Sequence, residues 1–83
     1  MIERFFRKNI TNLNHHLTMG FLESKGIYPT DDEAIIITNF LKENINFLLT
    51  DSNYIYNLKG MIREDIFNNI LLLYNEYKNK YLN

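Results

Sequence analysis

The sequence contains no cysteine, no tryptophan, one proline and only three glycines. Without cysteine the chain forms no disulfide, no thiolate metal site and no cysteine nucleophile, which is typical of a reducing cytoplasm. No segment approaches the roughly 20 apolar residues of a membrane span, and residues 1–10 lack the apolar core of a signal peptide. We therefore expect a cytoplasmic protein, and the sparse proline and glycine favour helices joined by short connections.

Neither sign of charge dominates. Nine Lys/Arg residues face ten Asp/Glu residues, and the basic residues are scattered, with small groups only near residues 4–8 and 78–80. Nucleic-acid binders usually carry a basic stripe that neutralises phosphates, so nucleic-acid binding is disfavoured. The 83 residues leave room for one hydrophobic core, hence a single helical domain over 1–83. Frequent Asn, Ile, Lys, Tyr and Phe point to an AT-rich bacterial or phage genome.

Three consecutive acids, Asp31, Asp32 and Glu33, raise the question of a metal or acid–base site. They follow Thr30, and the pattern Thr-x-x-Glu predicts a capping box. In it the Thr30 hydroxyl accepts a hydrogen bond from the Glu33 backbone amide, and the Glu33 carboxylate accepts one from the Thr30 backbone amide. Successive helical side chains point about 100° apart, which does not bring three carboxylates onto one ion. We interpret the cluster as the start of a helix.

Other chemistry is equally sparse. His15 and His16 are adjacent, whereas zinc-binding helices space their histidines four residues apart. Ser24 and Ser52 lack the glycine-flanked elbow of a serine nucleophile, and no glycine-rich phosphate loop is present. The sequence therefore predicts no enzyme, no metal, no cofactor and no small-molecule substrate. Carboxylates from distant helices could still meet in the fold, which leaves an enzyme as a hypothesis. It ranks last among the hypotheses.

Apolar spacing and helix-capping residues predict an all-α orthogonal bundle of four or five helices. Asn14 is the expected N-cap of the second helix, Gly20 would permit close approach of a neighbour, and Gly26 ends that helix. The stretch 44–49 alternates and is expected to be extended or a turn. The first segment, with Phe5 and Phe6, reads as an amphipathic helix packed on the domain, with an interfacial anchor as the alternative. The expected helices are 2–9, 14–25, 31–43, about 51–59 and 61–82.

The last helix has the widest apolar arc. Its stripe covers nearly half the circumference, which is more than one neighbouring helix needs. Leu72 lies on the opposite, polar face. Tyrosines are common in binding surfaces, but Tyr74, Tyr77 and Tyr81 are about equally compatible with the core. The candidate protein interface is Phe5, Leu72, Tyr74, Tyr77 and Tyr81.

Several short motifs between Asn14 and Phe47 carry a family resemblance. They are Lys25-Gly26-Ile27, the run 30–34, Leu41-Lys42 and the run 44–47. With these motifs the chain resembles the YqfT-like family of small proteins from Bacillus-type Firmicutes, over about half its length. It departs from that pattern at Pro29 and in its Tyr-rich last helix. The resemblance implies an all-helical cytoplasmic protein and brings no functional residues with it.

The leading functional hypothesis is a non-enzymatic interaction module that binds a protein partner or a second copy of itself. A phage-encoded inhibitor of a host protein is a special case. The alternative is a helix-turn-helix-like nucleic-acid binder, which would need a recognition helix with basic and amide side chains at its N-terminus.

Overall fold

The computed structural model describes residues 10–81, with the side chain of Tyr81 excluded. This part holds three α-helices, α2 (His15–Ser24), α3 (Asp31–Thr50) and α4 (Glu64–Tyr81), and one 3-10 helix, η1 (Tyr54–Leu58). No strand occurs within the described residues, where Lys59 and Ile62 form an isolated bridge. The all-α class is confirmed. The count of four or five helices is not matched, and the helix expected over 2–9 lies outside the described residues.

The predicted ends of α2 are confirmed. The Asn14 side chain accepts a hydrogen bond from the backbone amide of Leu17 (2.9 Å), as an N-cap does. Beyond the helix, Gly26 has φ +80°, and the Ile27 amide donates to the Leu22 carbonyl (2.9 Å). This is a Schellman ending, and its two side chains, Leu22 and Ile27, are both buried.

The expectation for Gly20 is wrong. A Cβ built on Gly20 would meet nothing within 4 Å, and the residue is exposed. Among residues 10–81, no neighbour lies close enough to require a glycine at this position.

Helix α3 begins as predicted but continues further. Thr30 and Glu33 form the capping box, with amide–oxygen distances of 2.9 and 3.1 Å. The helix then runs to Thr50, so the prediction that 44–49 is extended or a turn is wrong. Asn44 alone leaves helical geometry (φ −124°, ψ 17°), and its side-chain amide donates to the Phe40 carbonyl (3.0 Å) while its oxygen accepts from the Tyr54 hydroxyl (2.8 Å). These two bonds hold the kink and let the helix resume.

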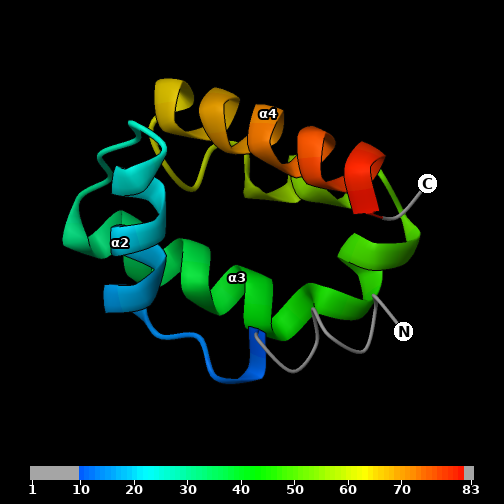
Figure 1. The fold of residues 1–83 in the computed structure, drawn as a ribbon, viewed down its shortest axis with the longest axis horizontal. Coiled ribbons are helices and arrows are strands. Elements are labelled where there is room, and N and C mark those ends of the chain that lie inside the picture. The colour runs from blue at the N-terminus through cyan, green and yellow to red at the C-terminus, as the bar shows by residue number, and fades with distance from the viewer. Residues whose placement is uncertain (1–9, 82–83) are drawn as a thin grey trace.

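The predicted helix at 51–59 is a shorter 3-10 helix, and α4 begins three residues later than expected. Gly60 takes φ +91°, a left-handed conformation that glycine adopts without strain, so the chain turns before Glu64. In Figure 1, α3 and α4 run lengthwise on opposite sides, and α2 crosses them at one end.

One core joins these elements. It is formed by one cluster of buried side chains from both long helices, η1 and the α2 ending. Its members are Leu22, Ile27, Ile37, Phe40, Leu48, Ile55, Leu58, Ile62, Ile66, Phe67 and Ile70.

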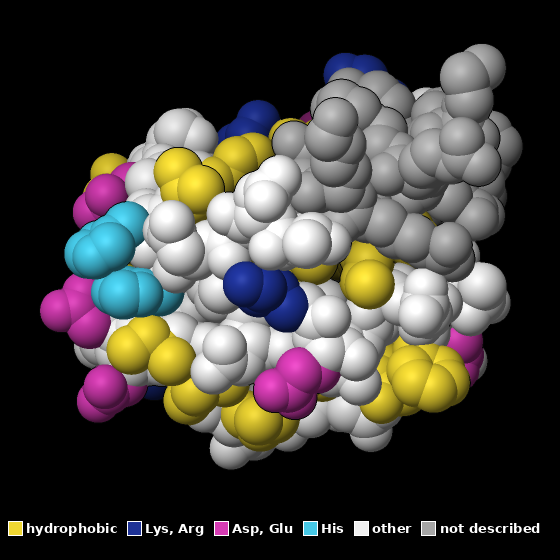
Figure 2. All heavy atoms as spheres, turned by 90° about the horizontal axis from the view of Figure 1, so that it is seen from below, with side chains coloured by type: hydrophobic (Ala, Val, Ile, Leu, Met, Phe, Trp, Pro, Cys, Tyr) yellow, Lys and Arg dark blue, Asp and Glu magenta, His cyan; other side chains and the backbone are white. Residues whose placement is uncertain are grey.

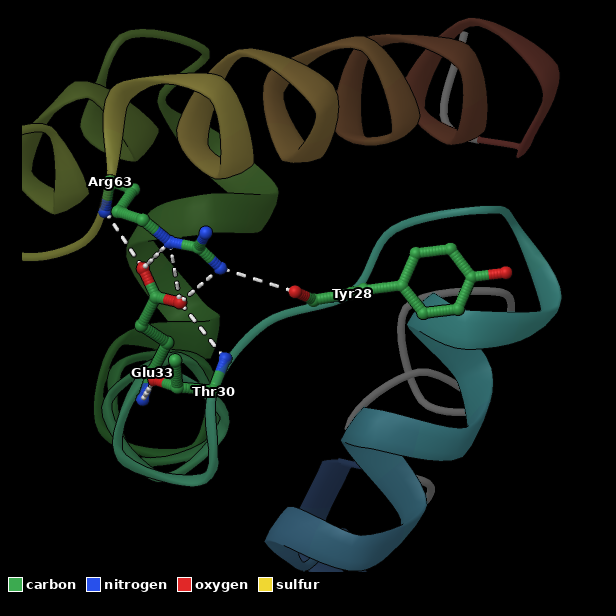
Figure 3. A network of polar contacts seen from close by, with 4 residues as sticks. All are labelled: Tyr28, Thr30, Glu33 and Arg63. Carbon is green, nitrogen blue, oxygen red and sulfur yellow. Dashed lines mark hydrogen bonds and ion pairs between the residues drawn. The ribbon is translucent and has the colours of Figure 1, made fainter.

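A polar network ties the start of α3 to the start of α4 (Figure 3). Glu33 accepts from the Arg63 guanidinium at 2.9 Å and from the Arg63 backbone amide at 2.9 Å. The same guanidinium donates to the Tyr28 carbonyl at 3.1 Å, and the Tyr28 ring points away from the network. One carboxylate thus fixes a helix cap, the connection before it and the helix packed above it.

Candidate functional site

The described residues enclose a large apolar cavity between α2, α3 and α4, which we call the α2–α3–α4 cavity. Its volume is about 490 Å³, and it opens to the surface. Ligand pockets in proteins range over about 300–1,000 Å³. Hydrophobic side chains form almost the whole lining. The lining residues are Ile10, Leu13, Thr18, Phe21, Leu22, Ile37, Leu41, Ile45, Leu48, Leu49, Ile55, Ile70, Leu73, Tyr74, Tyr77 and Lys78.

The floor of the cavity offers no free polar group. Thr18, on α2, is its one buried polar lining residue, and its hydroxyl lies 2.6 Å from the hydroxyl of Thr38. Thr38 in turn donates to the Ala34 carbonyl (2.7 Å). Since a hydroxyl carries one hydrogen, Thr18 is the donor to Thr38. A ligand would therefore meet an apolar floor.

Two aromatic rings from different helices frame the mouth. Phe21 on α2 and Tyr77 on α4 have ring centroids 6.1 Å apart and tilted by 44°, within the range of favourable aromatic pairs. Phe21 remains 44% exposed. The Lys25 ammonium lies 5.8 Å from the Phe21 ring, and the Lys78 ammonium lies 5.8 Å from the Tyr74 ring. Two lysine ammonium groups thus lie near aromatic rings that line the cavity.

Tyr74 is held inside the cavity by its hydroxyl, which donates to the Leu48 carbonyl. Burial raises the pKa of Tyr74, and the nearby negative charge of Asp51 adds to the shift. The phenol therefore stays protonated. It anchors α4 to the second half of α3.

The apolar lining of the cavity has a chemical consequence. Water needs polar partners, and the lining offers few of them. The cavity is therefore better suited to an apolar occupant than to a polar one.

The candidate interface residues do not form one surface. Tyr74 and Tyr77 both line the cavity. Leu72 is 67% exposed and lies nearly opposite them on α4, since each helical residue turns by about 100°. Phe5 and the Tyr81 side chain lie outside the described residues. The structure thus brings two of the five together and separates the third.

Sequence reasoning missed the α2 and α3 walls of the site. Phe21, Leu41, Ile45 and Leu49 line the cavity but were not candidates. The spacing of 41, 45 and 49 is four residues each time, a helical signal that the alternation at 44–47 concealed.

Acid–base chemistry finds little support. Hydrogen bonding to the Arg63 side chain lowers the pKa of Glu33 from 4.5 to about 2, against the opposing effect of burial, so this carboxylate stays ionised. The His15 and His16 rings pack against each other, with centroids 4.1 Å apart. Within residues 10–81, no group of three or more His, Cys, Asp or Glu side chains is placed to hold a metal ion.

Comparisons with known proteins find no family model, no curated protein and no solved structure that matches the chain. The resemblance to the YqfT-like family stays a prediction. In the part of the chain that the structure describes, no helix is both long and apolar enough to cross a bilayer.

Proposed function

We propose that this chain is a cytoplasmic, non-enzymatic interaction module that binds an amphipathic helix of a protein partner in the α2–α3–α4 cavity. The cavity carries the proposal, because it is large, apolar and open at a mouth framed by Phe21 and Tyr77. Helix-in-groove recognition uses such a surface, with apolar anchors at positions i, i+3 or i+4, and i+7.

The charges around the mouth define the partner further. Lys25 and Lys78 flank the rings of Phe21 and Tyr74, so we expect acidic residues beside the apolar face of the partner helix. Charge complementarity of this kind raises the association rate and selects among partners. A host protein bound by a phage-encoded inhibitor would fit this description as well as a partner from the same cell.

A pair of matched substitutions tests the site. Phe21→Glu places a charge at the mouth, and Leu72→Glu places the same charge on the far face of α4. Both positions are exposed, 44% and 67% respectively, so both variants should keep their helical circular dichroism. We expect Phe21→Glu to weaken the partner at least tenfold and Leu72→Glu to leave it unchanged.

The partner is first captured from native cells with the tagged full chain, then identified and rebound as a purified protein. Support requires that the purified protein binds, that Phe21→Glu weakens it, and that its interacting segment is a helix. Sedimentation runs alongside. A monodisperse monomer that rebinds no purified protein contradicts the proposal, and so does a complex that Leu72→Glu disrupts and Phe21→Glu does not. A dimer broken by Phe21→Glu would replace the partner with a second copy.

A further inference from the structure

We propose that the α2–α3–α4 cavity binds a single-chain fatty acid, with the alkyl chain on the apolar lining and the carboxylate beside the Lys78 ammonium. This goes beyond the sequence, which predicts no small-molecule substrate. A bound fatty acid would also compete with the partner helix. The competition rests on the proposed function, but the binding of the fatty acid to the free chain does not.

The size of the cavity distinguishes a small molecule from a helix. An α-helix with its side chains is about 10–12 Å wide and rises about 5.4 Å per turn, so two turns occupy on the order of 1,000 Å³. The cavity has a volume of about 490 Å³ and opens to the surface, so only some side chains of a helix can enter it. Small-molecule pockets range upwards from about 300 Å³. A flexible alkyl chain can therefore lie wholly inside.

The lining favours an alkyl chain over a polar ligand. Leucine and isoleucine form most of it. The Thr18 hydroxyl donates to Thr38, and the Tyr74 hydroxyl donates to the Leu48 carbonyl, so neither has a hydrogen left for a ligand. An alkyl chain needs no such donor. Each methylene that moves from water onto an apolar lining tightens binding roughly fourfold.

The head group is defined by one cation. Among the described residues, Lys78 is the only charged side chain of the lining. It is half-buried, its ammonium lies 5.8 Å from the centre of the Tyr74 ring, and it forms no salt bridge within residues 10–81. A half-buried cation attracts an anion more strongly than a cation in bulk water does. One ammonium matches one carboxylate, whereas a phosphate with about two negative charges would keep an unpaired charge in apolar surroundings.

Calorimetric titration of the full chain with sodium decanoate tests the site. We expect saturable binding of one ligand per chain, with octanoate roughly 15-fold weaker because it has two methylenes fewer. Lys78→Met should weaken decanoate by about fivefold, the upper end of what an exposed ion pair contributes, and leave uncharged decan-1-ol unchanged. Lys42→Met, at an exposed position on α3, is the matched control and should change neither. No binding of decanoate, or equal binding of octanoate and decanoate, overturns the proposal, and so does equal binding of decanoate by the two variants.

Methyl chemical shifts of the unaltered chain locate the ligand without any substitution. We expect decanoate to shift the methyl resonances of Leu41, Ile45 and Leu73, which line the cavity. The Leu72 methyl groups, on the far face of α4, serve as the control and should not move. Shifts at Leu72 in place of the cavity residues would mean that the fatty acid adheres to the surface, and would overturn the proposal.

The two proposals fail separately. If decanoate does not bind while Phe21→Glu still weakens a purified partner, the fatty acid is not a ligand of the cavity and the proposed function stands. If decanoate binds in the cavity but does not displace the purified partner, the cavity is a ligand site and the partner helix lies elsewhere.

Discussion

Arg63 and Glu33 face each other across the junction of α3 and α4, with the guanidinium 2.9 Å from the carboxylate. They are 30 residues apart in the chain, and their side chains are 52% and 9% exposed. Exposed ion pairs contribute little. This pair differs from an exposed one because Glu33 is buried and its carboxylate also accepts hydrogen bonds from the backbone amides of Thr30 and Arg63.

We expect Glu33→Gln to lower the free energy of unfolding by about 2 kcal/mol at pH 7, since hydrogen bonds to a buried charge contribute about 1.5–3 kcal/mol. The pKa of Glu33 is lowered in the folded state, from 4.5 to about 2. Its contribution is therefore complete above pH 4.5 and is lost as the pH falls from there towards 2. Urea unfolding followed by circular dichroism at pH 7 and pH 3 measures the difference between the two proteins, which should shrink at pH 3. Asp32→Asn, in the same helical turn, is the control for lost helix-terminal charge. A constant difference across that range would contradict the assignment.

Gly20 and Gly26 should respond to alanine in opposite directions. Neither would meet an atom within 4 Å at an added Cβ, so crowding does not distinguish them. Gly26 has φ +80°, which an alanine adopts only with strain, and we expect Gly26→Ala to destabilise by about 1 kcal/mol. Gly20 lies inside α2, where alanine is favoured over glycine by about 0.8–1 kcal/mol. Thermal unfolding of both variants tests this, and an equal shift in Tm would show that backbone geometry is not the cause.

The kink at Asn44 should depend on its bond to Tyr54. We expect Asn44→Ala to cost about 1 kcal/mol, the usual net contribution of a hydrogen bond, and Tyr54→Phe to cost the same or less. Because both remove the one bond of 2.8 Å, the double variant should lose less than the sum. A double-mutant cycle measured by urea unfolding gives the coupling energy, which we expect to be about 0.5–1 kcal/mol. Asn39→Ala, at an exposed position in the same helix, is the control; strict additivity would mean that the two side chains do not cooperate.

The sequence predicts the ends of the helices, which depend on local residues, but not the contacts between residues far apart in the chain. The Asn14 cap, the Thr30–Glu33 box and Gly26 each depend on residues within one turn, so their patterns predicted the structure. At the kink in α3, Asn44 accepts a hydrogen bond from Tyr54, ten residues away, whereas the alternation in 44–49 predicts an extended stretch or a turn. The cavity is lined by residues of three helices, α2, α3 and α4, so no single stretch of sequence marks it. The tyrosine-rich last helix makes Tyr74 and Tyr77 candidates, whereas the pattern of α2 does not single out Phe21 as a site residue.

The nucleic-acid alternative leads to a clear titration. The helix that follows the α2–α3 connection would be the recognition helix, yet its first turn carries Asp31, Asp32 and Glu33, which repel phosphates. On the face in Figure 2, the described Lys and Arg side chains are not gathered into one patch. We expect no change in fluorescence anisotropy when a labelled DNA duplex is titrated at low salt. Saturable binding that falls steeply with added salt would instead establish a basic surface.

The Thr18–Thr38 pair should show an asymmetric cost when each hydroxyl is removed. Both residues are 4% exposed, and Thr18 donates to Thr38 while Thr38 donates to the Ala34 carbonyl. Thr38→Val leaves the Thr18 hydroxyl without its acceptor, so we expect a loss of about 1–2 kcal/mol. Thr18→Val leaves Thr38 still bonded to Ala34 and should cost less. The double variant has no orphaned hydroxyl and should lie close to Thr18→Val, since replacing both partners by apolar groups of the same shape is nearly neutral. Urea unfolding of the three variants measures the order, and a Thr18→Val loss larger than that of Thr38→Val would reverse the direction of the hydrogen bond at the floor of the cavity.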